Sequence, residues 1–294
     1  MEKIMEQKLS INIGELESWS EIIRPQTGLF DLKLKEVWHY KDLLFMFVRR
    51  DFVATYKQTI LGPLWFFIQP LLTTFTFMVV FGTIAGISTD GIPMMVFYMS
   101  GITLWNYFAE CLNKTSTVFK DNANIFGKVY FPRLIMPLSI VVSNLVRLGI
   151  QMTLFVGVWG FYLLKGNALH PNLMLLLIPY LIFLMAVIGL GAGMLISALT
   201  TKYRDLIFLL SFGVQLLMYA TPVIYSMNTL PAKYAWIIKA NPLSAIIETF
   251  RYAFTGSGLF SWYALGYSSI AAFVLLILGT LVFNKVEKSF MDTV

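Results

Sequence analysis

Residues 58–89 read QTILGPLWFFIQPLLTTFTFMVVFGTIAGIST, a stretch of 32 positions without one charged side chain. A helix rises about 1.5 Å per residue, so about 20 apolar residues cross the ~30 Å hydrocarbon layer of a bilayer. No water satisfies the backbone polar groups in that layer, so each crossing must be a helix or part of a closed barrel. The stretch therefore predicts a membrane protein.

Composition supports helices over a barrel. The chain has 294 residues, of which 57% are hydrophobic and 13% are charged, values that exclude an ordinary soluble domain and a disordered chain. Barrel strands alternate apolar and polar residues, whereas 173–184 and 273–283 show no such alternation. We predict an all-α, polytopic protein with six transmembrane helices, at 60–87, 92–112, 134–164, 173–199, 206–225 and 262–283.

The remaining segments complete the expected organisation. Residues 1–35 form an N-terminal cytoplasmic segment without an assigned role, 36–59 an amphipathic interface helix, and 60–294 the transmembrane domain. The start of the chain carries charges throughout and lacks the apolar core of a signal peptide. Cys111 is the single cysteine, so it forms no internal disulfide and is expected to be a small buried packing residue.

Basic residues set the predicted orientation. The segment before the first crossing, the 113–133 loop, the 200–205 turn and the C-terminal tail together carry 17 Lys and Arg, against 4 in the opposite loops. Loops rich in Lys and Arg stay on the cytoplasmic side. Both termini are therefore predicted to be cytoplasmic.

Residues 36–57, EVWHYKDLLFMFVRRDFVATYK, have the pattern of a helix in the plane of the membrane interface. The apolar face would hold Val37, Tyr40, Leu44, Phe47, Val48 and Phe52. The break at Gly62-Pro63 would then turn the chain into the bilayer. Such a helix either only anchors the protein or also forms part of a docking surface, and the pattern does not separate the two.

Arg147 falls about 13 residues into the third predicted crossing, roughly 20 Å along its axis. An arginine there is costly unless it pairs, reaches the interface or faces water. Asn144 and Gln151 lie on the same helical face. This intramembrane polar group is either a structural contact between helices or part of an aqueous path.

Two stripes mix aromatic and polar side chains at helical spacing, one in the first crossing and one in the fifth. Apolar faces of sugars stack on aromatic rings, and sugar hydroxyls bond to amides. The stripes therefore predict a channel lining that suits a glycan, although Trp, Tyr, Gln and Thr also occur as ordinary interface and helix-contact residues. The candidate lining residues are Trp65, Gln69, Thr73, Thr76, Phe208, Phe212, Gln215 and Tyr219.

Gly189, Gly191, Gly193 and Ser197 form a small-residue patch in the fourth crossing. Small residues let helix backbones approach closely in a membrane, so we expect a packing seam. The patch is not a nucleotide-binding fingerprint, because no strand precedes it.

Residues 226–261 separate the fifth and sixth crossings and are semi-apolar. Within them, 243–254 read as a helix that begins at Asn241-Pro242 and ends at Gly256, and it is too short to span. Two interpretations stay open: a helix at or in the outer leaflet, and an external packing helix.

The sequence also lacks several catalytic signatures. It has no phosphate-binding GxxxxGK[ST] loop and no GxSxG elbow, and His39, His170 and Cys111 are too scattered for a metal site. We therefore expect neither an enzyme nor a bound metal or cofactor, and no nucleic-acid partner. The chain is expected to be a conduit that takes its energy from another subunit.

Several motifs together resemble the membrane subunits of ABC exporters for polysaccharides, the ABC-2 permeases of O-antigen, capsule and teichoic acid. The more specific matches are RRDF at 49–52, YKQTILGPLW at 56–65, QP at 69–70 and NANIFGKVYFP at 122–132. Weaker matches are YRD at 203–205, PVIY at 222–225 and NPL at 241–243. The resemblance runs from about residue 38 to the end.

The resemblance implies a homodimer that works with two copies of a cytoplasmic ABC ATPase, which would use ATP and magnesium. It implies a coupling loop at 113–133, outer gate helices at 229–256, and a location in the bacterial inner membrane. In the coupling loop, the residues expected to contact the ATPase are Asp121, Asn122, Asn124, Phe126, Lys128 and Tyr130.

The implied substrate is a polysaccharide on undecaprenyl diphosphate, with O-antigen favoured. Arginine suits phosphate because its planar fork makes paired charge-assisted hydrogen bonds. Each basic candidate has the alternative reading of a plain topology signal. Alternatives for the whole chain are a capsule, teichoic-acid, drug or lipid exporter, an intramembrane enzyme, or a scaffold. The diphosphate candidates are Arg49, Arg50, Lys57, Lys128 and Arg133.

Overall fold

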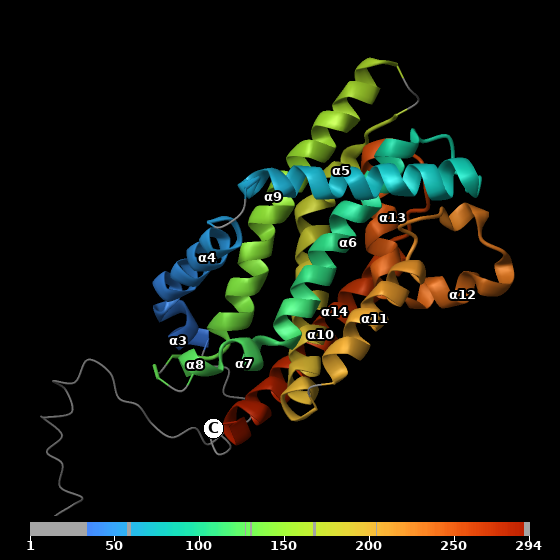
Figure 1. Ribbon diagram of the computed structural model, residues 1–294. Coiled ribbons are helices and arrows are strands. Elements are labelled where there is room, and N and C mark those ends of the chain that lie inside the picture. The colour runs from blue at the N-terminus through green and yellow to red at the C-terminus, as the bar shows by residue number, and fades with distance from the viewer. Residues whose placement is uncertain are drawn as a thin grey trace, which may run out of the picture. The chain divides into compact units, whose positions relative to one another are not determined.

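The computed structural model describes residues 34–57, 60–126, 128–129, 131–166, 169–203 and 205–290. The chain divides into Met1–Leu32 and Lys33–Val294, and every described residue belongs to the second unit. Within the described residues the regular structure is helical, with no strand (Figure 1). The predicted all-α class is confirmed.

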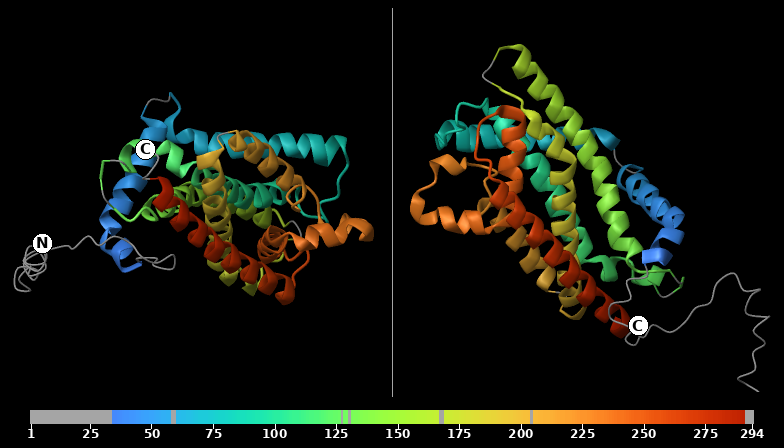
Figure 2. Two further views of the ribbon diagram at one scale, coloured as in Figure 1. Left: turned by 90° about the horizontal axis from the view of Figure 1, so that it is seen from below. Right: turned by 180° about the vertical axis from the view of Figure 1, so that it is seen from behind.

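The second unit is built around helix α10 (Ile178–Lys202), which continues the short helix η3 (Leu173–Leu177). Its most extensive contacts are with α14 (Trp262–Phe290) and α6 (Met94–Ser116). Helix α9 (Ile135–Leu164) also packs on α6. Figures 1 and 2 show these long helices side by side.

Three glycines of α10 make this packing close. A Cβ on Gly191 would lie 2.7 Å from the backbone of Leu275 in α14. A Cβ on Gly189 would lie 2.9 Å from Cβ of Cys111, and one on Gly193 would lie 2.6 Å from Cβ of Thr115. The predicted small-residue seam is therefore confirmed, and Cys111 is a buried free thiol within it.

Within the described part of the chain, four helical stretches are long and apolar enough to cross a membrane: Gly62–Ile84, Ile135–Leu164, Leu173–Lys202 and Trp262–Val286. Helix α6 is not among them. It is largely buried among its neighbours, so its surface need not match lipid.

Helix α11 (Leu206–Tyr219) is apolar but has 14 residues, or about 21 Å of rise. The sequence predicted a helix to residue 225, and that boundary was wrong. The chain leaves the helix before Pro222, since proline disfavours helical geometry in the residue before it. Thr221 is held instead by the Asn241 amide, whose Nδ2 donates to its Oγ1 at 2.8 Å.

The first apolar stretch consists of η1 (Gly62–Leu64), α5 (Trp65–Phe77) and the π-helical η2 (Met78–Ile84). Both figures show α5 running across the long helices instead of alongside them (Figures 1 and 2). Only 17% of the most apolar part of Gly62–Ile84 is buried, against 44% for the most apolar part of Leu173–Lys202. Hydropathy reports the length of an apolar helix and not its direction, so this crosswise course could not be predicted from the sequence.

The interface segment forms two helices, α3 (Leu34–His39) and α4 (Lys41–Tyr56), with a break at Tyr40. Phe47 is buried in the core, and the other five residues of the predicted apolar face are partly buried. The predicted face is confirmed. Phe45 and Met46 are exposed beside the charged residues, so the outer face of α4 is not purely polar.

Helices α12 (Ala232–Ala240) and α13 (Pro242–Thr255) form the predicted short helices after α11. The Asn241 side chain caps α13 by accepting from the Leu243 N–H at 3.0 Å, and Gly256 ends it with φ of +71°. Most of α13 is buried. Trp159 Nε1 donates to Phe254 O at 2.9 Å, so α13 packs inside the helical unit and does not lie along it.

Segments that the charge pattern assigned to one side lie together. Phe119 of α7 (Val118–Asp121) stacks on Phe283 at 4.6 Å between ring centroids, close to the end of α14. At the other end, Asn228 Nδ2 donates to Asp90 Oδ2 at 2.8 Å, and His170 N donates to Thr255 O at 3.0 Å. The loops therefore gather in two groups that match the predicted sides.

The α10 seam predicts a sharp difference between two glycines. Gly191→Ala is expected to destabilise the protein by about 1–3 kcal/mol, because its Cβ would meet backbone atoms of α14 that cannot turn aside. Gly157→Ala in α9 is the control, since nothing lies within 4 Å of its Cβ, and a gain of up to ~1 kcal/mol is expected from helix propensity. Unfolding by SDS in mixed micelles measures both, and equal effects would refute the seam.

Candidate functional site

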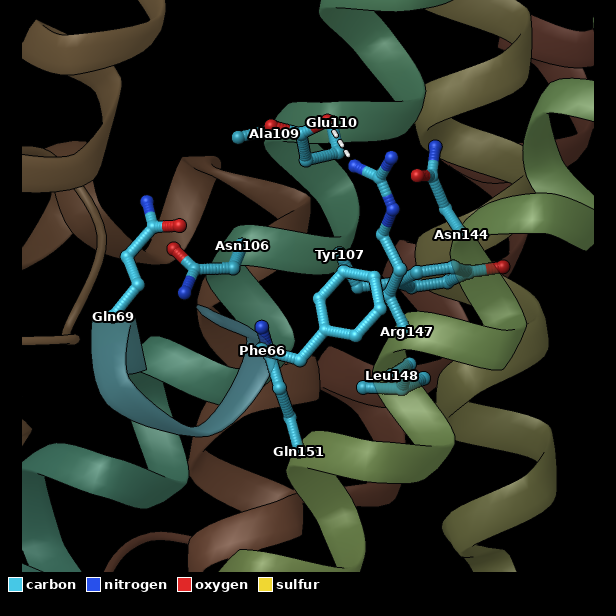
Figure 3. Close-up of a pocket in the computed structure, with 10 residues that line it drawn as sticks. All are labelled: Phe66, Gln69, Asn106, Tyr107, Ala109, Glu110, Asn144, Arg147, Leu148 and Gln151. Carbon is cyan, nitrogen blue, oxygen red and sulfur yellow. Dashed lines mark hydrogen bonds and ion pairs between the residues drawn. The ribbon is translucent and has the colours of Figure 1, made fainter. Parts of the chain in front are cut away.

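Two adjoining cavities lie where α4, α5, α6 and α9 meet. The first has a volume of about 120 Å³, and the second about 430 Å³. Asn144 and Arg147 line both. Figure 3 shows the first cavity, with Gln69 of α5 and Asn106 of α6 extending into the space beside Arg147. The predicted polar face of α9, with Asn144, Arg147 and Gln151, therefore lines a cavity.

One carboxylate bridges two cations that line these cavities. Arg147 Nη1 and Lys114 Nζ each lie 3.3 Å from the same oxygen, Oε2 of Glu110 (Figure 3 shows the Arg147 contact). The Arg147 guanidinium also lies over the ring of Phe66, at 5.4 Å. The Glu110 side chain is 47% exposed and Arg147 20%. Partly hydrated ion pairs of this kind are weak and rearrange readily.

The second cavity adds polar groups from α4 and the 113–133 loop. Arg50 Nη2 pairs with Asp51 Oδ1 at 2.8 Å, and both residues line the cavity together with Asp121. Among the described residues, Ser143 Oγ has no hydrogen-bond partner although it is buried. Buried polar atoms normally have partners, so water or a ligand atom is expected there.

The charge around the two cavities is balanced. Arg50, Lys114 and Arg147 bring three positive charges, and Asp51, Glu110 and Asp121 bring three negative ones. The site therefore carries no net positive charge that would attract anions by itself. An anionic group gains these cations only if a carboxylate turns away, and half-exposed Glu110 has the room to do so.

The predicted diphosphate candidates are dispersed. Of them, Arg50 lines a cavity. Arg49, Lys57 and Lys128 are exposed. Arg133 is buried with its guanidinium 5.5 Å from the centre of the Phe126 ring. Sequence reasoning left out Glu110 and Lys114 as site residues, although their i,i+4 spacing on a helix is a recognisable signal for a pair.

The candidate lining stripes lie mostly on the surface of the described chain. On α11, Phe208, Phe212, Gln215 and Tyr219 are all exposed. On α5, Trp65, Gln69 and Thr76 are exposed and Thr73 is partly buried. Thr73 and Thr76 donate their hydroxyls to Gln69 O and Leu72 O. Helices α5 and α11 both contact α6 but have no extensive contact with each other in the described structure.

The predicted coupling loop at 113–133, called the coupling segment below, contains the single-turn helices α7 and α8 (Ala123–Phe126). Its exposed residues include Asp121, Asn124 and Lys128, and Asn122 is partly buried with Nδ2 donating to Val118 O at 3.0 Å. Tyr130 lies outside the described residues.

Phe126 is buried instead of facing outward, in a cluster of rings under the coupling segment. Phe126 stacks on Phe131, which lies 5.7 Å from Phe47 of α4. Phe119 joins the cluster to α14 through Phe283. Pressure on α7 and α8 would therefore reach both α4 and α14.

A second charged pair lies at the other end, fully buried. Arg251 Nη1 donates to Glu248 Oε1 at 2.7 Å, and Nη2 donates to Pro222 O at 2.9 Å. The guanidinium lies 3.9 Å from the centre of the Phe97 ring. These contacts fasten α13 to α6 and to the chain after α11. Sequence reasoning counted Arg251 only as a topology charge, although Glu and Arg at i,i+3 in an apolar helix indicate a pair.

Burial sets the proton affinities of this pair. It raises the pKa of the Glu248 carboxyl, while the Arg251 charge and the Leu259 N–H oppose that rise. It lowers the pKa of Arg251 against the attraction of Glu248. Each charge is therefore tolerated there because the other is present.

In the part of the chain that the structure describes, no group of three or more His, Cys, Asp or Glu side chains is placed to hold a metal ion.

Removing one member of the buried pair is expected to cost more than removing both. Glu248→Met and Arg251→Met should each lower the free energy of unfolding by about 3–5 kcal/mol, because an unpaired buried charge remains. The double variant should lose clearly less than the sum of the two single losses. Unfolding by SDS of the unaltered protein, the two single variants and the double variant completes this double-mutant cycle. Strictly additive losses of unfolding free energy would show that Glu248 and Arg251 do not interact.

Comparison with known proteins finds relatives over most of the chain. The O-antigen export system permease protein RfbA of Klebsiella pneumoniae is 29% identical over 263 residues, covering 89% of this chain and 98% of the relative. RfbA of Myxococcus xanthus is 24% identical with the same coverage. The capsule polysaccharide export inner-membrane protein BexB of Haemophilus influenzae is 21% identical, covering 81% and 89%.

The sequence profile of the ABC-2 type transporter family matches residues 42–255, which is most of the chain. This family comprises membrane permeases without an ATPase domain of their own, which implies a separate ATPase partner. The sequence resemblance and the expectation of a non-enzymatic membrane protein are thereby confirmed. The chain belongs to the ABC-2 type transporter family and is a membrane permease.

Proposed function

We propose that this chain is the channel-forming subunit of an ATP-driven exporter that moves an undecaprenyl-diphosphate-linked polysaccharide, of O-antigen type, across the bacterial inner membrane. Two copies would pair, each with six crossings and cytoplasmic termini, and two ATPase subunits would use ATP and magnesium. The observation that carries the proposal is the exposed aromatic and amide stripe of α11 in a permease whose relatives are named for polysaccharide export.

The stripe supports a path between two copies of the chain. In α11, all of whose residues are described, Val214 is buried and the four residues of the stripe are exposed, so the face with the stripe is free to meet something outside the chain. Phe212 and Tyr219 offer rings for stacking on sugars, and Gln215 offers an amide for their hydroxyls. Two such helices facing each other would enclose a glycan with rings on both sides.

The coupling segment suits an ATPase partner. Asn124 and Lys128 are exposed, and the ring cluster beneath them connects with α4 and α14. Movement of the partner on ATP binding would therefore be passed to the interface helix and to the last long helix. This chain would supply the path and the coupling, and the partner would supply the energy.

The cavities around Arg147 suit the lipid diphosphate. Its phosphates would take over Arg147 and Lys114 while Glu110 turns toward water, and Arg50 would add a further cation. Glu110 would then hold the cations in place between transport cycles. The pair of Arg50 with Asp51 is short, at 2.8 Å, and would keep Arg50 oriented.

A second candidate is export of a capsule polysaccharide. The similarity to BexB favours it, since that relative is named for capsule export. We rank it second because the identity to the O-antigen permeases is higher.

Reconstitution tests the proposal directly. The subunit and its ATPase in liposomes, with lipid-linked glycan from the same bacterium, should move glycan into the lumen when ATP is added outside. Protection of the glycan from an added glycosidase measures the transfer. The control is the same complex with an ATPase variant that cannot hydrolyse ATP. ATP turnover without protected glycan would defeat the transport claim.

The same vesicles test the headgroup site. Arg147→Gln should weaken binding of the lipid-linked glycan by about 10-fold, because one phosphate-facing cation is lost. Glu110→Gln should strengthen it, because Arg147 and Lys114 lose their competing carboxylate. Lys165→Gln at the far end of α9 is the control and should bind as the unaltered protein. A shift in the same direction for both Glu110→Gln and Arg147→Gln would contradict the site.

A further inference from the structure

A separate pocket lies at the end of the molecule opposite the Arg147 cavities, between α12, α13 and the start of α14 (Figure 1 shows these three helices). It has a volume of about 480 Å³, within the roughly 300–1,000 Å³ typical of small-molecule sites. None of the candidate lining residues of α5 and α11 contributes to it. It is therefore a site apart from the proposed path.

The pocket wall combines rings with polar groups. Phe260, Tyr263 and Tyr267 contribute rings. Phe260 is held in orientation by Tyr252, with centroids 5.8 Å apart, and by Trp262 at 4.9 Å. Tyr267 donates its hydroxyl to Ala240 O at 2.8 Å, which fixes it against the end of α12. Tyr263 is 93% exposed, so its ring face is open to a ligand.

The floor of the pocket contains the buried hydroxyl of Ser244. Ser244 is 3% exposed and lines the pocket, and its Oγ has no hydrogen-bond partner among the described residues. A buried hydroxyl normally finds a partner, so a polar ligand atom or water belongs there. An acyl chain would leave it unsatisfied. The floor therefore favours a polar ligand.

The charges of the wall disfavour a phospholipid headgroup. Glu248 lines the pocket but is committed to Arg251 and to the Leu259 N–H. Of the described residues in the wall, Lys239 is then the one cation available. Anionic headgroups are usually met by clusters of basic residues. Rings at fixed angles, a free hydroxyl and a single amine instead match the apolar faces and hydroxyls of a sugar.

We propose that this pocket binds a short carbohydrate segment on the outer side of the membrane, after it has left the path between the two copies. Tyr263 stacks on a sugar ring, Ser244 bonds to a sugar hydroxyl, and Lys239 contacts a hydroxyl or acidic group at the rim. A bound segment would hinder the glycan from sliding back. The inference rests on the proposed export function.

Binding of a soluble probe tests the pocket without transport. The probe is the glycan of one to three repeat units, released by mild acid from the lipid-linked pool of the same bacterium. Saturation-transfer NMR on the permease–ATPase complex in phosphatidylcholine nanodiscs should show binding. Tyr263→Ala should raise Kd by at least about 10-fold, whereas Tyr263→Phe should keep most of the affinity. Ser244→Ala should weaken binding without lowering the unfolding midpoint.

Tyr234→Ala is the matched control, because Tyr234 is an exposed tyrosine of α12 outside the pocket. Unaltered binding in Tyr263→Ala, or no binding to the unaltered complex, would overturn the proposal. So would a phospholipid that copurifies with the unaltered protein and is lost in Tyr263→Ala and Lys239→Gln. Export into vesicles without sugar binding here defeats only the pocket, and sugar binding without export defeats only the export function.

Discussion

The close approach of α10 to its two neighbours is the constraint on which the other features depend. Lipid tails are as apolar as leucine, so helices in a membrane gain little from apolar burial and associate through fit and small residues. Gly191 brings α10 against the backbone of α14, and Gly193 brings it against Thr115 of α6. Helix α6 carries Glu110 and Lys114, and α14 carries Phe283 beneath the coupling segment. The seam therefore sets the positions of both the charged cavity and the loop proposed to meet the ATPase.

The two charged pairs differ in a way that suits transport. The Glu110–Arg147 pair has side chains 47% and 20% exposed at a separation of 3.3 Å, whereas the Glu248–Arg251 pair has side chains 4% and 1% exposed at 2.7 Å. The first pair exchanges partners at little cost, as a site that takes and releases an anion requires. The second pair cannot open without exposing a charge to an apolar interior. We infer that α13 and the turn at Pro222 move together, while the Arg147 site rearranges locally.

Sequence reasoning succeeded where one helix carries its own signal. The apolar face of α4, the cap at Asn241, the end at Gly256 and the α10 glycine patch all follow from spacing on a single helix, and the structure has each of them. It failed where the outcome depends on a neighbour. The course of α5 across the bundle depends on what other helices leave open, and so does the burial of α13.

The candidate sites show the same difference between signals within one helix and contacts between helices. Arg147, Asn144 and Gln151 were correctly placed on one polar face, but the pair with Glu110 needs the register between α6 and α9, which no single helix contains. Arg133 and Phe126 read as surface residues of a polar loop, yet both are buried in the ring cluster under it. The Arg251 contacts with Pro222 and Phe97 join segments far apart in the chain, so spacing alone could not reveal them.

In the proposed topology, the coupling segment and the proposed carbohydrate pocket lie on opposite sides of the membrane, with the basic end inside. Cys111 is the only cysteine and is fully buried, so a single introduced cysteine reports alone. The measurement is labelling of Asn124→Cys and Leu259→Cys with a membrane-impermeant maleimide, in spheroplasts before and after permeabilisation. With that topology, we expect Leu259→Cys to react in intact spheroplasts and Asn124→Cys to react only after permeabilisation. Labelling of both from the same side, or the reverse order, would contradict it.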